Sequence, residues 1–246
     1  GVSVVDAGVD HDFGDATGLI GRKVRRGTRN FAREPAMTEV ELESALEVGR
    51  ASVAALRGVE ALGLGEMGIG NTTAASAIVA ALLGARAEEV VGRGTGVGDV
   101  ALGRKRDVVA RALALHPSRE PREILRCLGG YEIVALVGAI EAAAERRMLV
   151  VLDGFIAGAA ALAAVRARPE LARFLVAGHV SAEPAHAVVL EALGLRPLLS
   201  LDMRLGEGSG AVLALGLVRS SVAILREMRT FEEANMPRPE DPRGRE

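Results

Sequence analysis

The stretch LGLGEMGIGNTTAASAI, from Leu62 to Ile78, changes from an apolar run into a cluster of glycines and then into small, helix-forming residues. This order predicts a strand, a glycine turn and a helix from Thr73 to Leu83 whose small residues allow close packing on a sheet. Glycine weakens the interior of strands and helices, so such a cluster marks a sharp turn or a place where a ligand approaches the backbone.

The same alternation continues on both sides of this stretch. Strands are predicted at VSVVDAG (2–8), MLVVL (148–152), FLVAGH (174–179) and the apolar run before LDMRLGEGSG, and helices at 156–166 and 184–193. The alternation favours a mostly parallel sheet with helices on both faces, an α/β fold that binds ligands beyond the carboxyl ends of its strands. The residues just past apolar runs are therefore expected at one edge: Glu66, Gly94, Asp153, His179 and Glu207.

Three other segments complete the predicted fold. Thr38, with Glu41 three residues later, has the spacing of a capping box and predicts the start of a helix. ILRCLGGYEIVALVGAIEAAAERR (124–147) predicts a helix with a glycine pair near its N-terminal end. Weak periodicity between Asp10 and Pro35 indicates a long connection, a kind of segment that is often functional.

Composition excludes several classes of protein. The 246 residues carry a formal net charge of −2 and include one tyrosine and no tryptophan, so both the basic surface and the stacking side chains of a nucleic-acid-binding protein are scarce. A single cysteine, Cys127, fits a reducing compartment and predicts a cytoplasmic location. No apolar run reaches the roughly 20 residues of a membrane span, and the N-terminal segment does not resemble a signal peptide. Because the chain begins without methionine, further residues are expected upstream.

The glycine loops suggest an anion site. GIGNTT has no lysine of the Walker type, and Gly63, Gly65 and Gly68 match the dinucleotide fingerprint only incompletely. The N-terminus of the following helix can still hold an anion. A second loop, GRGTG (92–96), is followed by Lys105, and two such loops on one sheet edge suggest a nucleoside monophosphate. Two alternatives remain: the first glycine loop is a tight turn that binds no ligand, and Lys105 is a solvent-exposed helix lysine.

Carboxylates and histidines add further candidates. Glu207 stands alone in LGEGSGA and would face solvent or substrate, where it can act as a general base. Asp153 either caps the helix that follows it or bonds a ribose hydroxyl. His179 and His186 lack the spacing of metal ligands and are assigned structural or substrate-orienting roles, and the cluster of Asp6, Asp10 and Asp12 is a solvated turn rather than a Mg²⁺ site.

Several motifs together resemble one enzyme family. GEMGIGNTT, GRGTG with its downstream RK, LGGYEI, VVLDGF, the segment containing SAEP between His179 and His186, and RLGEGSGA occur in this order between Val4 and Ala234. This order resembles the nicotinate-nucleotide:dimethylbenzimidazole phosphoribosyltransferases of cobalamin lower-ligand assembly. GEMGIGNTT and LGEGSG are highly distinctive of that family.

The resemblance implies transfer of phosphoribose from nicotinate mononucleotide to a nitrogen of 5,6-dimethylbenzimidazole, giving α-ribazole 5′-phosphate and nicotinate, without metal or cofactor. It implies a Rossmann-like large domain, here 1–215, and a small helical domain to which a helix in 216–236 contributes, followed by a frayed tail at 237–246. It also implies a homodimer. Family members have an additional N-terminal region that supplies part of the base pocket and of the small domain.

Residue roles also follow from the resemblance. Glu207 matches the catalytic glutamate that takes the proton of the benzimidazole, and Glu66 lies at the substrate site. Positions around the nucleotide phosphate are matched by Gly68, Gly94 and Lys105, and the residues that shape the loops or the remaining substrate contacts are Asn71, Thr72, Gly96, Asp153, Gly206 and Gly208.

Three alternatives stay open at this point. A close variant of the enzyme accepts adenine or another benzimidazole. A non-catalytic nucleotide- or base-binding module of the same fold would need no general base, so the two glutamates count against it. An NAD-dependent oxidoreductase is disfavoured by the incomplete fingerprint.

Overall fold

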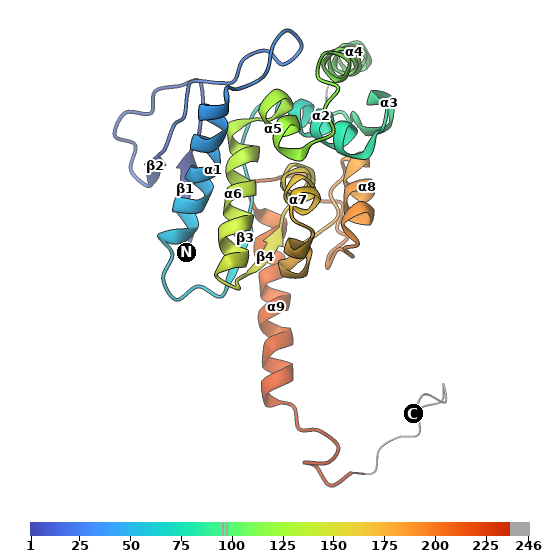
Figure 1. The fold of residues 1–246 in the computed structure, drawn as a ribbon. Helices are drawn as coiled ribbons and strands as arrows, with labels where there is room; N and C mark the ends of the chain where they lie inside the picture. The colour runs from blue at the N-terminus through green and yellow to red at the C-terminus, as the bar shows by residue number, and fades with distance from the viewer. Residues whose placement is uncertain (95, 97, 237–246) are drawn as a thin grey trace.

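The computed structural model describes residues 1–94, 96 and 98–236. Its central sheet has three parallel strands in the order β3 (Ala61–Leu64), β4 (Leu149–Leu152) and β5 (Leu175–Ala177). A second, two-stranded parallel sheet pairs β1 (Val4–Asp6) with β2 (Leu19–Gly21) beside α1 (Glu39–Ala54) (Figure 1). The predicted parallel α/β fold is confirmed.

Helices make every crossover of the central sheet. Between β3 and β4 run α2 (Thr72–Leu83), α3 (Ala87–Val90), α4 (Asp99–Leu115), α5 (Pro121–Leu128) and α6 (Tyr131–Glu145). Between β4 and β5 run α7 (Phe155–Ala167) and the short 3₁₀ helix η1 (Pro169–Phe174), and α8 (Pro184–Leu193) and α9 (Ser209–Glu227) follow β5. Parallel strands need such crossovers, because a tight turn can join only antiparallel neighbours.

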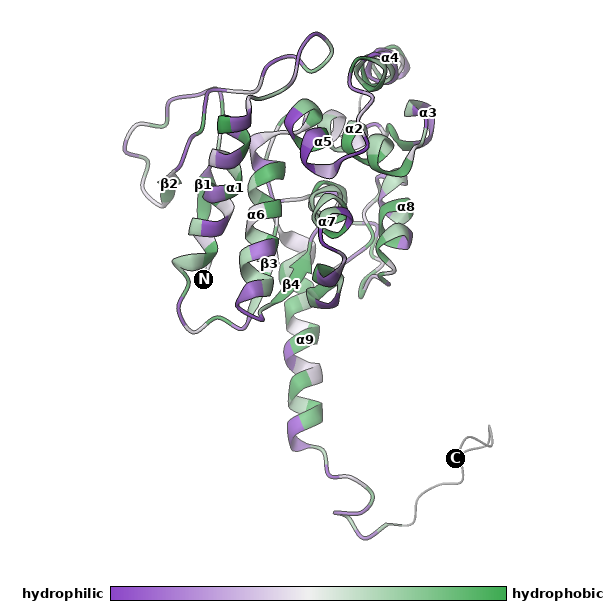
Figure 2. Cartoon of the chain, viewed as in Figure 1, coloured by the Kyte–Doolittle hydropathy of each residue, from purple (hydrophilic) through white to green (hydrophobic). Residues whose placement is uncertain are grey.

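Alternation along β4 separates the two faces of the sheet. Val150 and Leu152 belong to the main core, whereas Val151 packs with Ala211 and Ala214 of α9 on the other face. Helix α7 lies at the centre of the main-core side of the sheet (Figure 2). Ten consecutive residues of this helix are buried, and most of them are alanines. Helices therefore cover both faces of the sheet, as the alternation of the sequence predicts.

Helices α1 and α6 pack with their backbones in close contact. A Cβ atom on Gly49 would overlap the carbonyl of Ala135, and one on Gly138 would overlap that of Leu46. The predicted capping box begins α1, with the Glu41 N–H donating to Thr38 Oγ1 at 3.2 Å and the Thr38 N–H donating to the Glu41 carboxylate at 2.7 Å.

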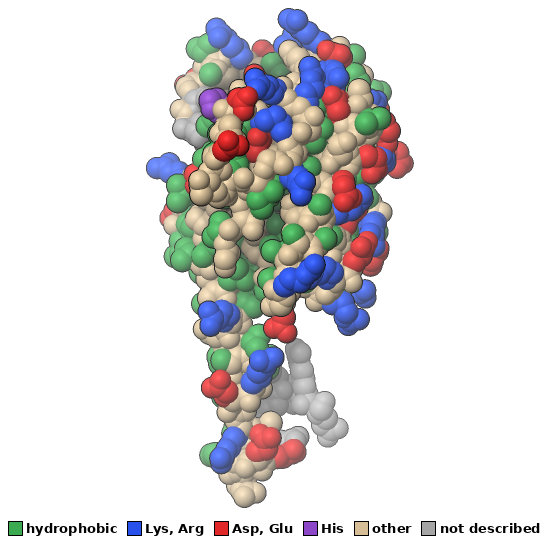
Figure 3. Space-filling model, turned by 90° about the vertical axis from the view of Figure 1, so that its left-hand side faces the viewer, with side chains coloured by type: hydrophobic (Ala, Val, Ile, Leu, Met, Phe, Trp, Pro, Cys, Tyr) green, Lys and Arg blue, Asp and Glu red, His purple; other side chains and the backbone are tan. Residues whose placement is uncertain are grey.

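Helix α9 extends from the body of the molecule (Figures 1 and 3). Its first turns pack on β3 and β4, whereas Leu213, Ile224 and Leu225 are exposed. Length and composition would let this helix cross a membrane, but a single helix of this kind is weak evidence of a span. The helix is continuous across residue 215, where the large domain is predicted to end.

The structure corrects three local predictions. The connection between Asp10 and Pro35 contains a strand, β2, which pairs with β1, so β1 is not part of the central sheet. The segment predicted as one helix contains two, α5 and α6, with Gly129 and Gly130 between them. Leu199 forms only an isolated bridge with His179 instead of a strand. The predicted frayed tail lies outside the described residues.

Candidate active site

The carboxyl ends of the three central strands bring together side chains distant in sequence. β3 ends at Leu64 and is followed by Glu66, β4 is followed directly by Asp153, and β5 is followed by His179. Backbone hydrogen bonds continue just past the strands, from Asp153 N–H to Leu64 O at 3.1 Å and from Gly178 N–H to Leu152 O at 2.8 Å. The predicted clustering of these residues at one edge of the sheet is confirmed.

Two glycine loops meet at this edge. A Cβ atom on Gly65 would overlap the backbone of Gly208, so the GEMG and GEGSG loops are in backbone contact only because position 65 is glycine. Gly206 and Gly208 have positive φ angles, and Glu207 between them has φ of 58°, an uncommon conformation for a residue with a side chain. The loop geometry thus presents Glu207, which is exposed, beside the loop that carries Glu66.

Asp153 fixes the start of α9. Its carboxylate accepts the backbone N–H groups of Gly208 at 3.2 Å, Gly210 at 2.7 Å and Ala211 at 3.3 Å. The side chain is buried and does not cap α7, because its hydrogen-bond partners lie at the start of α9. Its negative charge also suits the positive end of the helix dipole. Asp153 therefore supports the Glu207 loop.

Glu66 belongs to a cluster of acidic groups. Its carboxylate accepts a hydrogen bond from the side-chain amide of Asn71, the residue preceding α2. Burial raises the pKa of Glu66 to about 7, and the charges of Glu132, Asp153 and Glu207 act in the same direction, while the Asn71 hydrogen bond opposes them. Glu66 therefore titrates near neutral pH, where a general acid or base is most useful.

Glu132 is a member of this cluster that sequence reasoning missed. It lies in the first turn of α6. Burial raises the pKa of Glu132, although hydrogen bonds from its own N–H and from Asn71 lower it. The sequence offered one signal for Glu132, its position just after a glycine pair at the start of a helix. Only the fold shows that it lies near Glu66.

Lys105 joins the second glycine loop to the N-terminus of α2. Its Nζ donates to Thr72 Oγ1 at 2.8 Å and to the carbonyl of Gly92 at 2.9 Å. Gly94 has φ of 57°, and a Cβ there would crowd the Thr72 hydroxyl; Gly96 also has a positive φ. Burial lowers the pKa of Lys105, while the carboxylate of Glu183 raises it. A half-buried ammonium at the positive end of a helix is suited to bind a phosphate.

The first glycine loop approaches the same helix end. Gly68 lies against the Asn71 amide, which a Cβ would displace, and Gly70 has φ of 85°. Five of the substrate-contact residues predicted from sequence thus lie around the start of α2: Gly68, Asn71, Thr72, Gly94 and Lys105.

The two histidines after β5 are buried beside the site. Ser181 N–H donates to Nδ1 of His186 at 2.9 Å, so a neutral His186 carries its proton on Nε2. Burial, and less strongly His179, lowers the pKa of His186 to about 4. His179 Nε2 lies 3.5 Å from Asp153 Oδ1, and a Cβ on Gly210 would overlap the His179 ring. The His179 ring therefore packs against the first turn of α9, and both rings are buried.

The predicted solvated turn is not correct for Asp6, which is the last residue of β1 and is buried. Asp6 accepts the N–H groups of Gly8 and Val9 at 3.1 and 3.0 Å and pairs with Lys23 at 2.5 Å. Asp12 pairs with Arg26 at 3.0 Å. Within residues 1–94, 96 and 98–236, no group of three or more His, Cys, Asp or Glu side chains is arranged to hold a metal ion.

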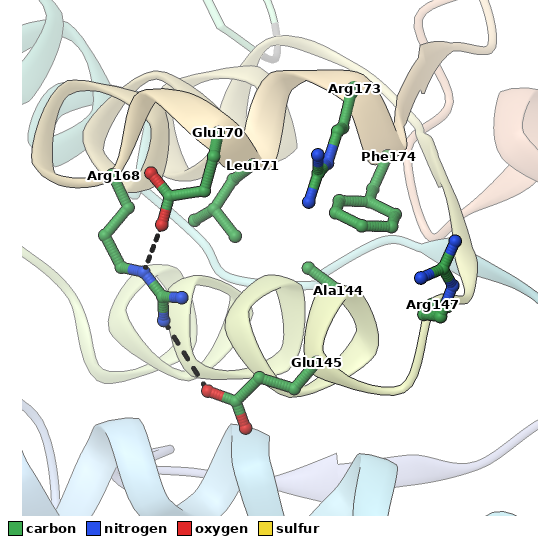
Figure 4. A pocket seen from close by; sticks show the side chains of 8 residues that line it. All are labelled: Ala144, Glu145, Arg147, Arg168, Glu170, Leu171, Arg173 and Phe174. Carbon is green, nitrogen blue, oxygen red and sulfur yellow. Dashed lines mark hydrogen bonds and ion pairs between the residues drawn. The ribbon is translucent and has the colours of Figure 1, made fainter.

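A cavity of about 290 Å³ lies at the opposite, amino-terminal edge of the sheet, between the end of α6 and η1 (Figure 4). Arg147, Arg173 and Phe174 line it, and Arg168 there is paired with Glu145 at 3.5 Å and Glu170 at 3.0 Å. None of the predicted site residues lines this cavity.

Comparison with known proteins places these features in a family. A family model described as phosphoribosyltransferase matches residues 1–236. Nicotinate-nucleotide–dimethylbenzimidazole phosphoribosyltransferase from Geobacter sulfurreducens is 51% identical over 239 residues, which cover 96% of this chain and 68% of the relative. The enzyme of that name from Thermus thermophilus is 53% identical over 240 residues, covering 96% of this chain and 71% of the relative.

A solved structure extends the similarity to three dimensions. The crystal structure of CobT from Thermus thermophilus superposes with a TM-score of 0.92 at 52% identity, over 96% of this chain and 72% of that one.

Proposed function

The chain belongs to the nicotinate-nucleotide–dimethylbenzimidazole phosphoribosyltransferase family, and we propose on this premise that it transfers phosphoribose from nicotinate mononucleotide to 5,6-dimethylbenzimidazole in cobalamin biosynthesis. The products are α-ribazole 5′-phosphate and nicotinate. The observation that carries the proposal is the contact of Gly65 with Gly208, which brings Glu66 and Glu207 to one edge of the sheet.

The phosphate of the nucleotide binds, in this proposal, at the start of α2. Lys105 supplies a positive charge and the Thr72 side chain a hydroxyl group. Gly68 and Gly94 of the two glycine loops leave the backbone open to the phosphate, because they have no side chain. Binding the phosphate there anchors the ribose near the carboxyl ends of β3 and β4. The non-reacting phosphate thereby orients the reacting carbon.

Glu207 is the proposed general base. It takes the N–H proton of the benzimidazole while the other ring nitrogen attacks C1′ of the ribose and the bond to nicotinate breaks. Attack from the face opposite the leaving group inverts the β-glycosidic bond to α. Positive charge develops on the ribose in the transition state, and the carboxylates of Glu66 and Glu207 stabilise it.

Apolar side chains flank both carboxylates. Met67 and Ile69 of the first loop are 61% and 92% exposed, and Leu205 of the second loop is 73% exposed. Together these side chains offer an apolar surface for a flat aromatic base. They support an apolar acceptor over a polar one such as adenine.

The oligomeric state and location are part of the proposal. The exposed apolar residues Val212, Leu213 and Leu225 of α9 support a homodimer, because surfaces of this kind are commonly buried in assemblies. The free, buried thiol of Cys127 is compatible with a cytoplasmic location. Sedimentation velocity tests the dimer.

The test of function is a chromatographic assay with nicotinate mononucleotide and 5,6-dimethylbenzimidazole. The proposal predicts equal amounts of nicotinate and α-ribazole phosphate, and a preference for the benzimidazole when adenine competes. Tight calorimetric binding of both ligands with neither product formed would favour the non-catalytic module instead.

A further inference from the structure

The cavity at the amino-terminal edge of the sheet combines apolar and charged side chains. Its apolar lining consists of Ala144, Leu171 and Phe174. Three arginines and two glutamates line it as well, so the lining carries one positive charge in excess (Figure 4). With a volume of about 290 Å³, the cavity has the size of a site for a small ligand.

One of the three arginines neutralises both glutamates. Arg168 pairs with Glu145 at 3.5 Å and with Glu170 at 3.0 Å. The charge of Arg173 also acts on Glu170, but from beyond the distance of an ion pair. In the part of the chain that the structure describes, neither Arg147 nor Arg173 has an ion pair or a side-chain hydrogen bond. Two guanidinium groups therefore line one small cavity with their N–H groups available.

Phe174 supports one of these guanidinium groups. The Arg173 guanidinium lies over the Phe174 ring, 5.0 Å from its centroid, which is a cation–π contact. Such a contact uses the flat face of the guanidinium and leaves its N–H edge free to donate hydrogen bonds. In Figure 4 the Phe174 ring lies between the guanidinium groups of Arg173 and Arg147. Donors and an aromatic surface are thus presented together.

Arg147 occupies a backbone position that favours glycine. It lies just beyond the end of α6 with φ of 57°, and its N–H donates to Ala144 O at 2.9 Å. Helices commonly end with a glycine in this left-handed conformation, which is costly for a residue with a side chain. The backbone thus gives no reason for an arginine at position 147, and glycine can replace it without strain.

We propose that this cavity is a second ligand site, separate from the proposed active site, and that it binds a small organic carboxylate. The carboxylate accepts hydrogen bonds from Arg147 and Arg173, because guanidinium donors match the two oxygens of a carboxylate. The apolar part of the ligand contacts Leu171 and Phe174. A single negative charge balances the excess positive charge of the lining, whereas a doubly charged phosphate would exceed it and be repelled by the two glutamates.

A nuclear magnetic resonance titration with benzoate tests the site. Benzoate is an aromatic carboxylate, and benzamide is a neutral molecule of the same shape. Methyl signals report where the probe binds: Ala144 and Leu171 line the cavity, whereas Met67 lies on the loop after β3, at the opposite edge of the sheet. Benzoate is expected to shift the Ala144 and Leu171 signals saturably. Benzamide should bind there at least about tenfold more weakly, because it has no charge to pair with the arginines.

Two substitutions remove the proposed donors. Arg147→Gly and Arg173→Gln should each weaken benzoate binding by at least about tenfold, as expected for the loss of a charged hydrogen-bond donor. Because glycine suits the backbone at position 147, Arg147→Gly should unfold at no lower urea concentration than the wild type. Arg166→Gln is the matched control: this arginine is exposed on α7 and does not line the cavity, so benzoate binding should not change.

Several results would overturn the proposal: no saturable shift of the Ala144 and Leu171 signals, equal binding of benzoate and benzamide, or unchanged benzoate binding in both Arg147→Gly and Arg173→Gln. Inorganic phosphate tests the charge argument, and it should bind at least about tenfold more weakly than benzoate. Phosphate binding as tight as that of benzoate would contradict the assignment to a carboxylate. None of these measurements uses transfer activity, so the proposal stands or falls independently of the proposed function.

Discussion

The carboxylate of Asp153 accepts the backbone N–H of Gly210 at 2.7 Å, and this hydrogen bond ties the end of β4 to the first turn of α9. The same carboxylate holds Gly208, the residue after the proposed base. A strand end thus positions Glu207 without touching it.

Asp153→Asn tests this support. In asparagine an NH₂ group replaces one of the two carboxylate oxygens. This group cannot accept a hydrogen bond, so at least one of the backbone N–H groups would lose its acceptor. We expect kcat to fall at least about tenfold, the KM for nicotinate mononucleotide to change little, and unfolding free energy to fall by about 1–3 kcal/mol. Steady-state kinetics and urea unfolding measure these effects. Asp107→Asn, at an exposed position of α4, is the control. An unchanged kcat in Asp153→Asn would refute the supporting role of Asp153.

Gly65→Ala tests the contact between the two loops. The added methyl group would overlap the Gly208 backbone, so the loops must separate and transfer activity should fall by more than about tenfold. Gly216→Ala is the matched control, because a Cβ on this α9 residue meets nothing within 4 Å and alanine favours a helix by about 0.5–1 kcal/mol. Equal activities of the two variants would show that the loop contact is not required.

Lys105→Met tests the phosphate site. Loss of a charged hydrogen-bond donor is expected to raise the KM for nicotinate mononucleotide by about 10- to 100-fold, which corresponds to about 1.5–3 kcal/mol. With nicotinate riboside, which has no phosphate, wild type and variant should be equally poor. Arg104→Met, an exposed neighbour on α4, serves as the control. A defect of the same size with the riboside would place Lys105 elsewhere than at the phosphate.

Glu66→Gln tests the raised pKa through stability. The folded-state pKa of about 7 lies above the ordinary value of 4.5, so between these values the folded protein holds a proton that the unfolded chain has lost. Ionising Glu66 therefore costs stability as pH rises from 4.5 to 7, and the full penalty is present above pH 7. The unfolding free energy of Glu66→Gln minus that of the wild type should therefore increase by about 1–3 kcal/mol from about pH 4 to about pH 8. Urea unfolding at several pH values measures this difference. A difference independent of pH would contradict the raised pKa.

Local patterns in the sequence predicted the elements around the site. The glycine cluster after Leu64 indicated the strand, turn and helix of β3 and α2, and Thr38 with Glu41 indicated the capping box of α1, because both depend on neighbours within a few residues. The rule that parallel strands end at one edge also placed Glu66, Asp153 and His179 together.

Contacts between distant segments could not be predicted in this way. Asp153 binds the start of α9, which lies far along the chain: the hydrogen bond from Gly208 N–H to Asp153 spans 55 positions. Glu132 also influences the pKa of Glu66 from the first turn of α6, far along the chain. β2 has three residues in a polar segment, too few for a periodic pattern, and its pairing with β1 is set by tertiary packing.

The most direct test of the account is the assay of nicotinate and α-ribazole phosphate with Glu207→Gln beside the wild type, together with calorimetric binding of nicotinate mononucleotide. We predict equal amounts of the two products from the wild type, a loss of at least about 100-fold in turnover for Glu207→Gln, and nearly unchanged nucleotide binding. Near-normal turnover of Glu207→Gln would contradict the claim that Glu207, held between Gly206 and Gly208, is the general base.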